Sequence, residues 1–532
     1  MKAAGAATAA TMTMAGCLTG DGDDSGGTLT YARGNDSGTL DPQATSSGED
    51  AKVIQQIYDQ AIHFKPGETT LTEGLANEYE LSGQEVTLSF REGANFHSGE
   101  EFTAEDFKAT YRRFLDDGYE HFVGTENQSY YGPYLLSAVE NVSVDGDYEV
   151  TLELSKKHAP MLRNLAVFAF AMISKSSIES DDPLRKNPDG TGPFEFEEWN
   201  ESDAQIRLTA YDDYWGETPN VDEVVFSEIK ENSSRAQALN AGEVDIIDGL
   251  DAQTTSTVEN AGDAELVTTP GINVGYMALN MARKKPFREK KVRQAMNYAV
   301  DTKSIVENIY SGLAVQASQP VPENMAGYND SVDPYAHDPD QAQTLLEEAG
   351  YGDGFEMELA TFQNPRTYNP SPVSAAEAVK SNLSEVGIDA TINQMEFNAY
   401  IEYTASGKHD ACFLGWMTDN ADPDNFFYAL LTPGAEISDG QDWVSFDADG
   451  FNTLNVAAWA HEEYTNLVTE AQTTYDEDAR VSNYEEASKI AHEEAPWVFV
   501  DHAREIRGVH NNVSGFTIAP ISGPFLNQVS LE

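Results

Sequence analysis

The sequence predicts an α/β protein built from more than one compact unit. The chain has 532 residues, more than a single hydrophobic core normally organises. Its 40% hydrophobic and 10% aromatic content is sufficient for such cores and argues against a disordered chain. Segments with the two-residue period of strands alternate with segments that have the period of helices, and this mixture is typical of α/β layering.

Strands and helices are mixed from the beginning of the chain. Residues 28–32 and 86–91 alternate between apolar and polar side chains, which predicts two strands. A helix is expected after Thr103, because Asp106 completes a capping box and apolar residues follow at helical spacing.

A second helix-to-strand step is expected in the later part of the chain. Apolar residues at helical spacing lead to Gly387, where the helix should end, and the alternating residues 388–392 predict a strand. Residues 411–414 form an apolar run that predicts a buried strand, with Cys412 as an inert core residue.

The composition is strongly acidic. The chain has 90 acidic and 32 basic residues, a formal net charge of −58 and a pI near 4.2. Such a surface repels nucleic acid and anionic membranes, so we expect neither as a partner. Self-repulsion of this size is tolerated mainly in concentrated salt, where the Debye length falls to about 3 Å at 1 M, and this predicts a halophilic source.

One basic cluster stands out from this acidic background. It covers residues 283–293. We interpret it as a helix start that balances acidic neighbours, with a docking surface for a membrane partner as the alternative.

The N-terminal residues have the order of a lipoprotein leader. Residues 1–17 form a weakly apolar segment that ends in a lipobox-like site at Cys17, and residues 18–27 form a flexible, acidic tether. An ordinary signal peptide with an accidental cysteine is the alternative. We expect an exported protein held at the outer face of the cytoplasmic membrane by lipid alone, since the apolar runs elsewhere are too short to span a bilayer.

Short catalytic motifs are absent from the sequence. It contains no nucleophile elbow, P-loop, zinc-protease helix or CxxC pair. We therefore expect no catalytic residues, no metal ligands and no cofactor, and a protein that is not an enzyme, although a triad assembled in space leaves no short motif.

Several segments, in the same order along almost the whole chain, resemble one family. They are residues 88–99, 102–106, 190–194, 273–280, 291–295 and 415–427. They are similar to the peptide-binding family of solute-binding proteins that serve ABC importers, and within it to dipeptide-binding proteins. The resemblance implies a two-lobed clamp of the periplasmic-binding-protein type, in which each lobe is α/β and the ligand lies between the lobes.

The same resemblance implies the domain boundaries and the partners. Lobe I should combine residues 28–272 with 499–532 and should contain an extra subdomain at residues 62–185. Lobe II should be residues 273–498. The expected partners are a short peptide and the permease and ATPase subunits of an importer, and the receptor itself is expected to be a monomer.

A free dipeptide carries an ammonium and a carboxylate, so a buried site needs one anion and one cation. The resemblance implies that Asp419 binds the ammonium and Arg366 the carboxylate, where a guanidinium suits bidentate binding. For Asp419 the alternative is a helix cap or a surface carboxylate, and for Arg366 a loop arginine paired with surface acids. Trp416 is expected in the pocket wall, with core packing as the alternative, and Gly415 would let the ligand backbone approach closely.

Lobe I should contribute polar contacts from the loop after the first strand, at Asn35 and Ser37. Asp422 and Asp424 flank a proline and are interpreted as turn residues at the surface.

The function predicted from these residues is capture of dipeptides or short peptides outside the cell. The alternatives are the same clamp with another solute, such as a nickel complex, a sugar or haem, and a secreted peptide hydrolase.

Overall fold

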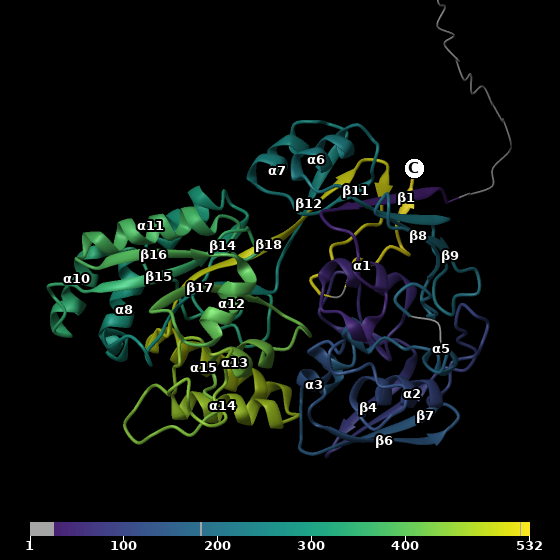
Figure 1. Ribbon diagram of the computed structural model, residues 1–532, viewed down its shortest axis with the longest axis horizontal. Helices are drawn as coiled ribbons and strands as arrows, with labels where there is room; N and C mark the ends of the chain where they lie inside the picture. The colour runs from purple at the N-terminus through teal and green to yellow at the C-terminus, as the bar shows by residue number, and fades with distance from the viewer. Residues whose placement is uncertain (1–25, 181–183, 522) are drawn as a thin grey trace, which may run out of the picture.

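The computed structural model describes residues 26–180, 184–521 and 523–532. It shows a two-lobed α/β clamp, so the predicted fold class is confirmed (Figure 1). The long strand β18 (Trp497–His510) runs diagonally between the lobes.

The lobe that contains the N-terminal strand is built on a mixed sheet. Strand β1 (Thr28–Arg33) pairs in parallel with β10 (Glu223–Glu228) and β11 (Ile246–Ile247), which confirms the first predicted strand. Strands β9 (Gln205–Ala210) and β8 (Phe194–Asn200) extend this sheet in antiparallel fashion. The helices of this lobe include α1 (Gly48–Ile57), α6 (Asn232–Asn240) and α7 (Ala252–Glu259).

A separate antiparallel sheet lies below this lobe in Figure 1. Its strand order is β4 (Ala76–Ser82), β5 (Glu85–Phe90), β7 (Glu149–Leu154) and β6 (Val139–Gly146). Helix α2 (Ala104–Leu115) begins with the predicted capping box and places Phe107 against Phe90 of the sheet, with 5.4 Å between the ring centroids. The predicted strand and helix are therefore confirmed. Shorter elements here are β2 (Ile62–Phe64), β3 (Leu71–Glu73), α3 (Tyr131–Leu135), α4 (Met161–Asn164) and α5 (Lys175–Ile178).

The other lobe has a sheet of order β16, β15, β17, β13. Strand β15 (Glu356–Phe362) runs parallel to β16 (Asp389–Met395) and β17 (Ala411–Met417), and β17 runs antiparallel to β13 (Asn273–Leu279). Helix α11 (Pro372–Glu385) is followed by Gly387 at φ +76° and then by β16, which confirms the predicted helix-to-strand step. Cys412 is buried within β17, as predicted.

Further helices complete this lobe. Helices α8 (Lys290–Ala299), α10 (Pro339–Glu348) and α12 (Phe397–Ala405) lie beside its sheet, and α13 (Asp424–Leu431), α14 (Glu462–Thr473) and α15 (Glu477–Glu494) form a layer below it (Figure 1). Short elements are α9 (Thr302–Ser304), the π-helix η4 (Ile305–Ile309) and β14 (Ala314–Gln316).

Strand β18 belongs to the sheets of both lobes. Its first residues pair with β13, and its last residues pair with β12 (Ala264–Pro270) and β11. The pairing with β13 shifts register next to Gly275, which lies opposite Asp501. Because β12 leads directly into β13, the two connections between the lobes lie side by side.

The layer of α13–α15 contacts the region of the separate antiparallel sheet through hydrogen bonds. Asn420 donates to Asn164 at 2.6 Å, and the Ala159 backbone N–H donates to the Gln472 carbonyl at 2.8 Å. The Tyr475 hydroxyl donates to the Gly83 carbonyl at 2.8 Å. The two lobes are therefore in direct contact on the side of the clamp away from the β12–β13 connection.

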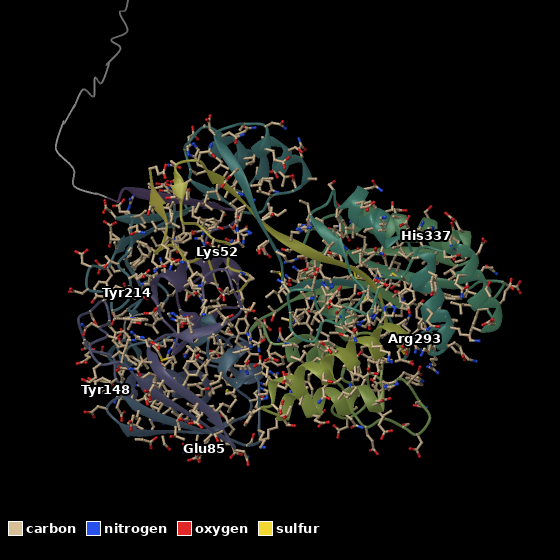
Figure 2. All side chains as sticks on the ribbon, turned by 180° about the vertical axis from the view of Figure 1, so that it is seen from behind. Lys52, Glu85, Tyr148, Tyr214, Arg293 and His337 are labelled. Carbon is tan, nitrogen blue, oxygen red and sulfur yellow. The ribbon has the colours of Figure 1, made fainter. Side chains whose placement is uncertain are left out.

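The basic cluster at residues 283–293 is paired with acids of its own lobe. Arg293 (Figure 2) is fully buried and lies 2.9 Å from Asp442 and 3.0 Å from Glu494. Lys290 lies 2.7 Å from Glu494, and Arg283 lies 3.1 Å from Asp410. The cluster thus balances local acidic side chains, as the first interpretation expected.

Within the described ranges, no helix combines the length and the apolar character needed to cross a bilayer. Cys17 and the leader lie outside the described residues.

Candidate ligand-binding site

The loop after β17 presents Asp419 in a fixed orientation. The backbone N–H of Asp419 donates to the Asn425 side-chain oxygen at 2.9 Å, and the Asn425 amide donates to Asp419 Oδ2 at 3.1 Å. The Trp416 indole N–H donates to the same Asn425 oxygen at 2.9 Å. Asn425, in the first turn of α13, therefore positions both the carboxylate and the indole. Sequence reasoning missed this residue, although it lies within the same short stretch.

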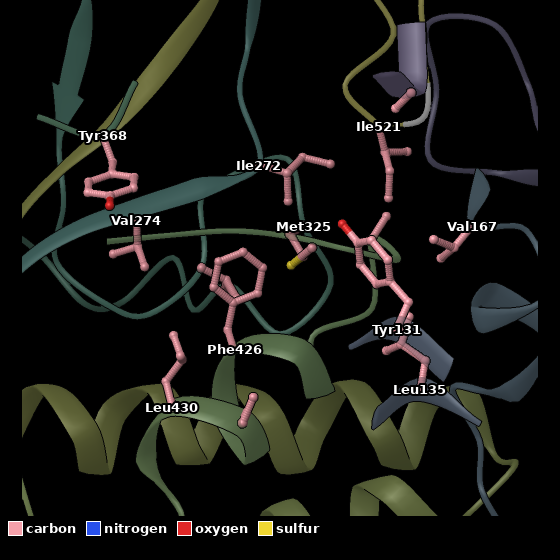
Figure 3. Close-up of a cluster of buried hydrophobic side chains, with 14 of the residues drawn as sticks. Tyr131, Leu135, Val167, Ile272, Val274, Met325, Tyr368, Phe426, Leu430 and Ile521 are labelled. Carbon is pink, nitrogen blue, oxygen red and sulfur yellow. The ribbon is translucent and has the colours of Figure 1, made fainter. Parts of the chain in front are cut away.

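The other lobe supplies a second partner for this carboxylate. The Tyr130 hydroxyl donates to Asp419 Oδ1 at 2.8 Å, and the rings of Tyr130 and Tyr131 lie 4.3 Å apart. Asp419 therefore lies at the contact between the lobes. Figure 3 shows that Tyr131 approaches the second lobe within a cluster of apolar side chains. No motif in the sequence pointed to Tyr130.

Asp419 has only neutral partners. Across the described residues it makes no ion pair. Burial raises the pKa of Asp419 to about 6, although the hydrogen bonds from Tyr130 and Asn425 oppose this rise. A half-buried carboxylate that lacks a cation would gain from a bound ammonium group.

Exposed apolar side chains flank Asp419. In the described chain five large hydrophobic side chains are exposed, and two of them are Tyr130 at 43% and Met417 at 46%. Tyr130 contacts Asp419 from the other lobe, and Met417 precedes Asp419 by two residues at the end of β17.

Arg366 lies in the loop between β15 and α11. A tight turn fixes the loop, because the backbone groups of Arg366 and Asn369 exchange hydrogen bonds of 3.0 and 2.9 Å. The exposed guanidinium stacks on the Phe397 ring, 3.6 Å from its centroid. Among the described residues it makes no ion pair, so its charge is available to a ligand carboxylate. Sequence reasoning did not identify Phe397.

Gly415 makes room for the same loop. A Cβ atom at Gly415 would stand 2.2 Å from the ring of Tyr368, two residues after Arg366. The Tyr368 ring therefore occupies the space beside Gly415, and this contact ties the Arg366 loop to β17. This packing gives a structural reason for glycine at this position.

Asn35 and Ser37 follow β1 in the other lobe. Asn35 is exposed, whereas Ser37 is buried and its hydroxyl accepts a hydrogen bond of 3.0 Å from Arg33. Arg33 is fully buried and lies 3.3 Å from Asp36. Ser37 is thus engaged within its own lobe, and the described residues show no contact from Asn35 or Ser37 to Asp419 or Arg366.

The surface location predicted for Asp422 and Asp424 is wrong. Asp422 is 0% exposed and Asp424 is buried, because side chains of α14 and α15 in the same lobe surround this turn, with Arg163 added from the other lobe. Asp422 lies 2.8 Å from Arg480 and 3.8 Å from Arg163 of the other lobe, beside a cavity of about 360 Å³ that both arginines line. The Asp422 carboxylate does form the predicted turn, since it accepts from the Asp424 backbone N–H at 3.0 Å.

The charges around these two carboxylates differ. The two arginines hold the pKa of Asp422 below its usual value, although burial alone would raise it. Burial and the negative charge of Asp422 raise the pKa of Asp424 to about 7, and Gln472 donates to Asp424 at 3.0 Å.

Comparison with known proteins identifies the family. Residues 70–437 match the family described as bacterial extracellular solute-binding proteins, family 5 Middle. The chain belongs to this family. The predicted resemblance is therefore confirmed, and the two-lobed fold is the one this family has.

The relatives of this solute-binding protein are binding proteins of similar length. The chain is 30% identical to the dipeptide-binding protein of Escherichia coli (strain K12), with 95% of each chain covered. It is 31% identical to heme-binding protein A of Haemophilus influenzae, covering 90% of this chain and 87% of the relative. Among solved structures, the periplasmic binding protein DppA of Helicobacter pylori in complex with peptide STSA has a TM-score of 0.78 and 29% identity, covering 96% of this chain and 99% of that one.

Proposed function

We propose that this protein is the extracytoplasmic receptor of an ABC importer that captures dipeptides or short peptides. The observation that carries the proposal is Asp419, a half-buried carboxylate at the contact between the lobes that has neutral partners from both of them. The similarity to a dipeptide-binding protein over 95% of the chain supports the same ligand class.

The ligand ammonium would bind Asp419. A carboxylate has about four lone-pair sites, so the tyrosine and Asn425 hydrogen bonds at Asp419 leave room for a ligand donor. Because the Tyr130 oxygen can still accept while its hydrogen is donated to Asp419, it offers the ammonium a second acceptor. The indole of Trp416, fixed by Asn425, forms a wall beside this position.

The ligand carboxylate would bind Arg366. The guanidinium presents two parallel N–H donors, and Phe397 holds its plane from one face. A short peptide that joined Asp419 to Arg366 would span one lobe, and Tyr130 would cover it from the other. Closure of the lobes around the bound peptide would then present the loaded receptor to the permease and ATPase subunits.

We propose that the chain divides into its two lobes at the segments that connect them. Lobe I comprises residues 28–272 and 499–532, with its extra subdomain at 62–185, and lobe II comprises 273–498. The β12–β13 connection and β18 support a hinge at this division, because they lie side by side and both pass between the lobes. We also propose that Asn35 and Ser37 make polar contacts to the peptide backbone. Asn35 is exposed and is the more accessible of the two.

We also propose that the mature protein is a monomeric lipoprotein attached through Cys17, and that it works in concentrated salt. The order of the leader segments supports lipid attachment at Cys17, and the net charge of −58 supports function in concentrated salt. Mass spectrometry of membrane-extracted protein tests the first, because a lipidated N-terminal Cys17 has a defined added mass. Unfolding measured against salt concentration tests the second.

Isothermal titration against a panel of dipeptides tests the function. Wild-type protein should bind saturably without turnover, whereas Asp419→Ala and Arg366→Ala should each weaken binding by about 30-fold or more, since losing one partner of a buried charge pair costs ~2–5 kcal/mol. The matched controls are Asp212→Ala and Arg112→Ala, at exposed positions outside the site. Unchanged affinity in both site variants would refute the assignment.

A second candidate ligand is haem, because the chain is as similar to heme-binding protein A as to the dipeptide-binding protein. Haem added to the same titration panel decides between them. A peptide hydrolase would instead release free amino acids from the dipeptides.

A further inference from the structure

Asp501 lies at the junction of the lobes without a polar partner. It is fully buried in β18, and both of its carboxylate oxygens lack a hydrogen-bond partner in the protein. An unpaired buried carboxylate is costly to retain. Sequence reasoning did not single out this residue, and the proposed contacts to peptide do not use it.

The Asp501 carboxylate and a carbonyl of the loop that carries Arg366 lie against the same face of Gly275. Asp501 Oδ1 lies 2.2 Å, and the Tyr368 carbonyl oxygen 2.5 Å, from the point where a Cβ atom of Gly275 would stand. The absence of a side chain at Gly275 therefore leaves room for both oxygens in the same place. Both are acceptors, so their approach is favourable only if a proton or a cation lies between them.

We propose that Asp501 is a positioning residue: as a neutral carboxylic acid it donates a hydrogen bond to the Tyr368 carbonyl and so fixes the Arg366 loop on the hinge strand. The inference rests on the proposed function, because Arg366 matters only if the ligand has a carboxylate. The Tyr368 ring on Gly415 and the Tyr368 carbonyl on Asp501 would then hold the loop at two points, on the strands β17 and β18 that flank β13.

A proton suits the space between these oxygens better than a metal ion. In the part of the chain that the structure describes, no group of three or more His, Cys, Asp or Glu side chains could hold a metal. Burial raises the pKa of Asp501 well above its usual value, and no positive charge opposes this rise.

The neighbouring titratable groups do not supply a counter-charge. His502 binds the Asn273 carbonyl at 2.6 Å through Nδ1, and burial lowers the pKa of His502 to about 4, so it is neutral. Arg366 stacks on Phe397 and makes no ion pair with Asp501. Three buried tyrosines of neighbouring elements also have raised pKa values: Tyr276 of β13, Tyr310 beside η4 and Tyr368 of the loop. The charged residues further along β18, Arg504, Glu505 and Arg507, do not shift the pKa of Asp501.

The test compares Asp501→Asn with Asp501→Ala. The asparagine amide can donate to the Tyr368 carbonyl at every pH, so dipeptide affinity should stay within about twofold of wild type, whereas the alanine variant should bind about tenfold more weakly. Wild-type affinity should fall at alkaline pH as Asp501 ionises, and the asparagine variant should lack this fall. Equal losses of affinity in Asp501→Asn and Asp501→Ala, or the same pH profile in wild type and Asp501→Asn, would overturn the inference.

An infrared difference spectrum decides the protonation state without any ligand. At pH 7 the wild-type minus Asp501→Asn spectrum should contain the carbonyl band of a protonated carboxylic acid, and the difference for the exposed control Asp389→Asn should not. A carboxylate band would contradict the proposal. Stability that depends on sodium rather than choline at constant ionic strength, and loses that dependence in Asp501→Asn, would assign the site to a cation instead.

These measurements separate the two proposals. If wild-type protein binds no dipeptide, the proposed function fails, while the infrared result still reports on Asp501. If it binds dipeptides and the two Asp501 variants behave alike, only the positioning role fails.

Discussion

Asp419 and Asp422 stand three residues apart on one loop and have opposite surroundings. Asp419 receives hydrogen bonds from Tyr130 and Asn425 and has no cation, so its pKa is raised to about 6. Asp422 is fully buried between Arg480 and Arg163, and its pKa is lowered. The protein thus satisfies one carboxylate with its own arginines and leaves the other without a cation, which is why we propose Asp419 as the ligand's partner.

The largest expected effect is on stability, at Asp422. Replacing Asp422 by alanine leaves Arg480 and Arg163 without their buried anion, and breaking a buried pair in this way typically costs ~3–5 kcal/mol of unfolding free energy. Urea denaturation of Asp422→Ala measures this loss, with the exposed Asp449→Ala as control. A loss of unfolding free energy below about 1 kcal/mol is typical of a surface ion pair and would contradict the contrast between Asp419 and Asp422.

The pH dependence should have opposite signs at the two positions. Between pH 3.8 and about 6, Asp419 has lost its proton in the unfolded chain but keeps it in the folded protein. The free energy of unfolding therefore falls as pH rises through this window. At 1.36 kcal/mol per pH unit, Asp419→Asn should gain up to about 3 kcal/mol over wild type at pH 8 and nothing below pH ~4. Asp422 stabilises the fold above its unfolded pKa and loses this contribution as pH falls through its lower folded pKa.

Unfolding free energies of Asp419→Asn and Asp422→Asn, measured from pH 3 to pH 8 against wild type, check these signs. Ligand binding sharpens the test: an ammonium favours the ionised form of Asp419, so dipeptide binding near pH 6 should release a proton. Titration in two buffers with different ionisation enthalpies measures that proton, and Asp419→Asn should not release it. Parallel pH profiles for the two variants would contradict the contrast.

The fold, and the strand that leads into the candidate site, were predicted from the sequence, whereas the ligand contacts stay predictions. The apolar run at residues 411–414 correctly placed a strand before the loop, because burial of a strand is a local property of its side chains. The burial of Asp422 could not be predicted, since it depends on Arg480, which α15 of the same lobe supplies, and on Arg163, which comes from the other lobe. Tyr130 was missed for the same reason, because it lies 289 residues from Asp419.

The smallest expected effect belongs to Tyr130, the contact that joins Asp419 to the other lobe. Tyr130→Phe removes one hydrogen bond to the carboxylate and one acceptor for the ligand ammonium, while it keeps the ring that covers the site. Dipeptide affinity should therefore fall by about fivefold, equivalent to ~1 kcal/mol for one hydrogen bond. The matched control is Tyr148→Phe, whose hydroxyl donates to Glu101 at 2.7 Å on a distant surface (Figure 2). Tighter dipeptide binding by Tyr130→Phe would mean that the Tyr130 hydroxyl competes with the ligand for Asp419. The protein would then satisfy Asp419 with its own side chains, as it does Asp422, and the contrast between the two carboxylates would be lost.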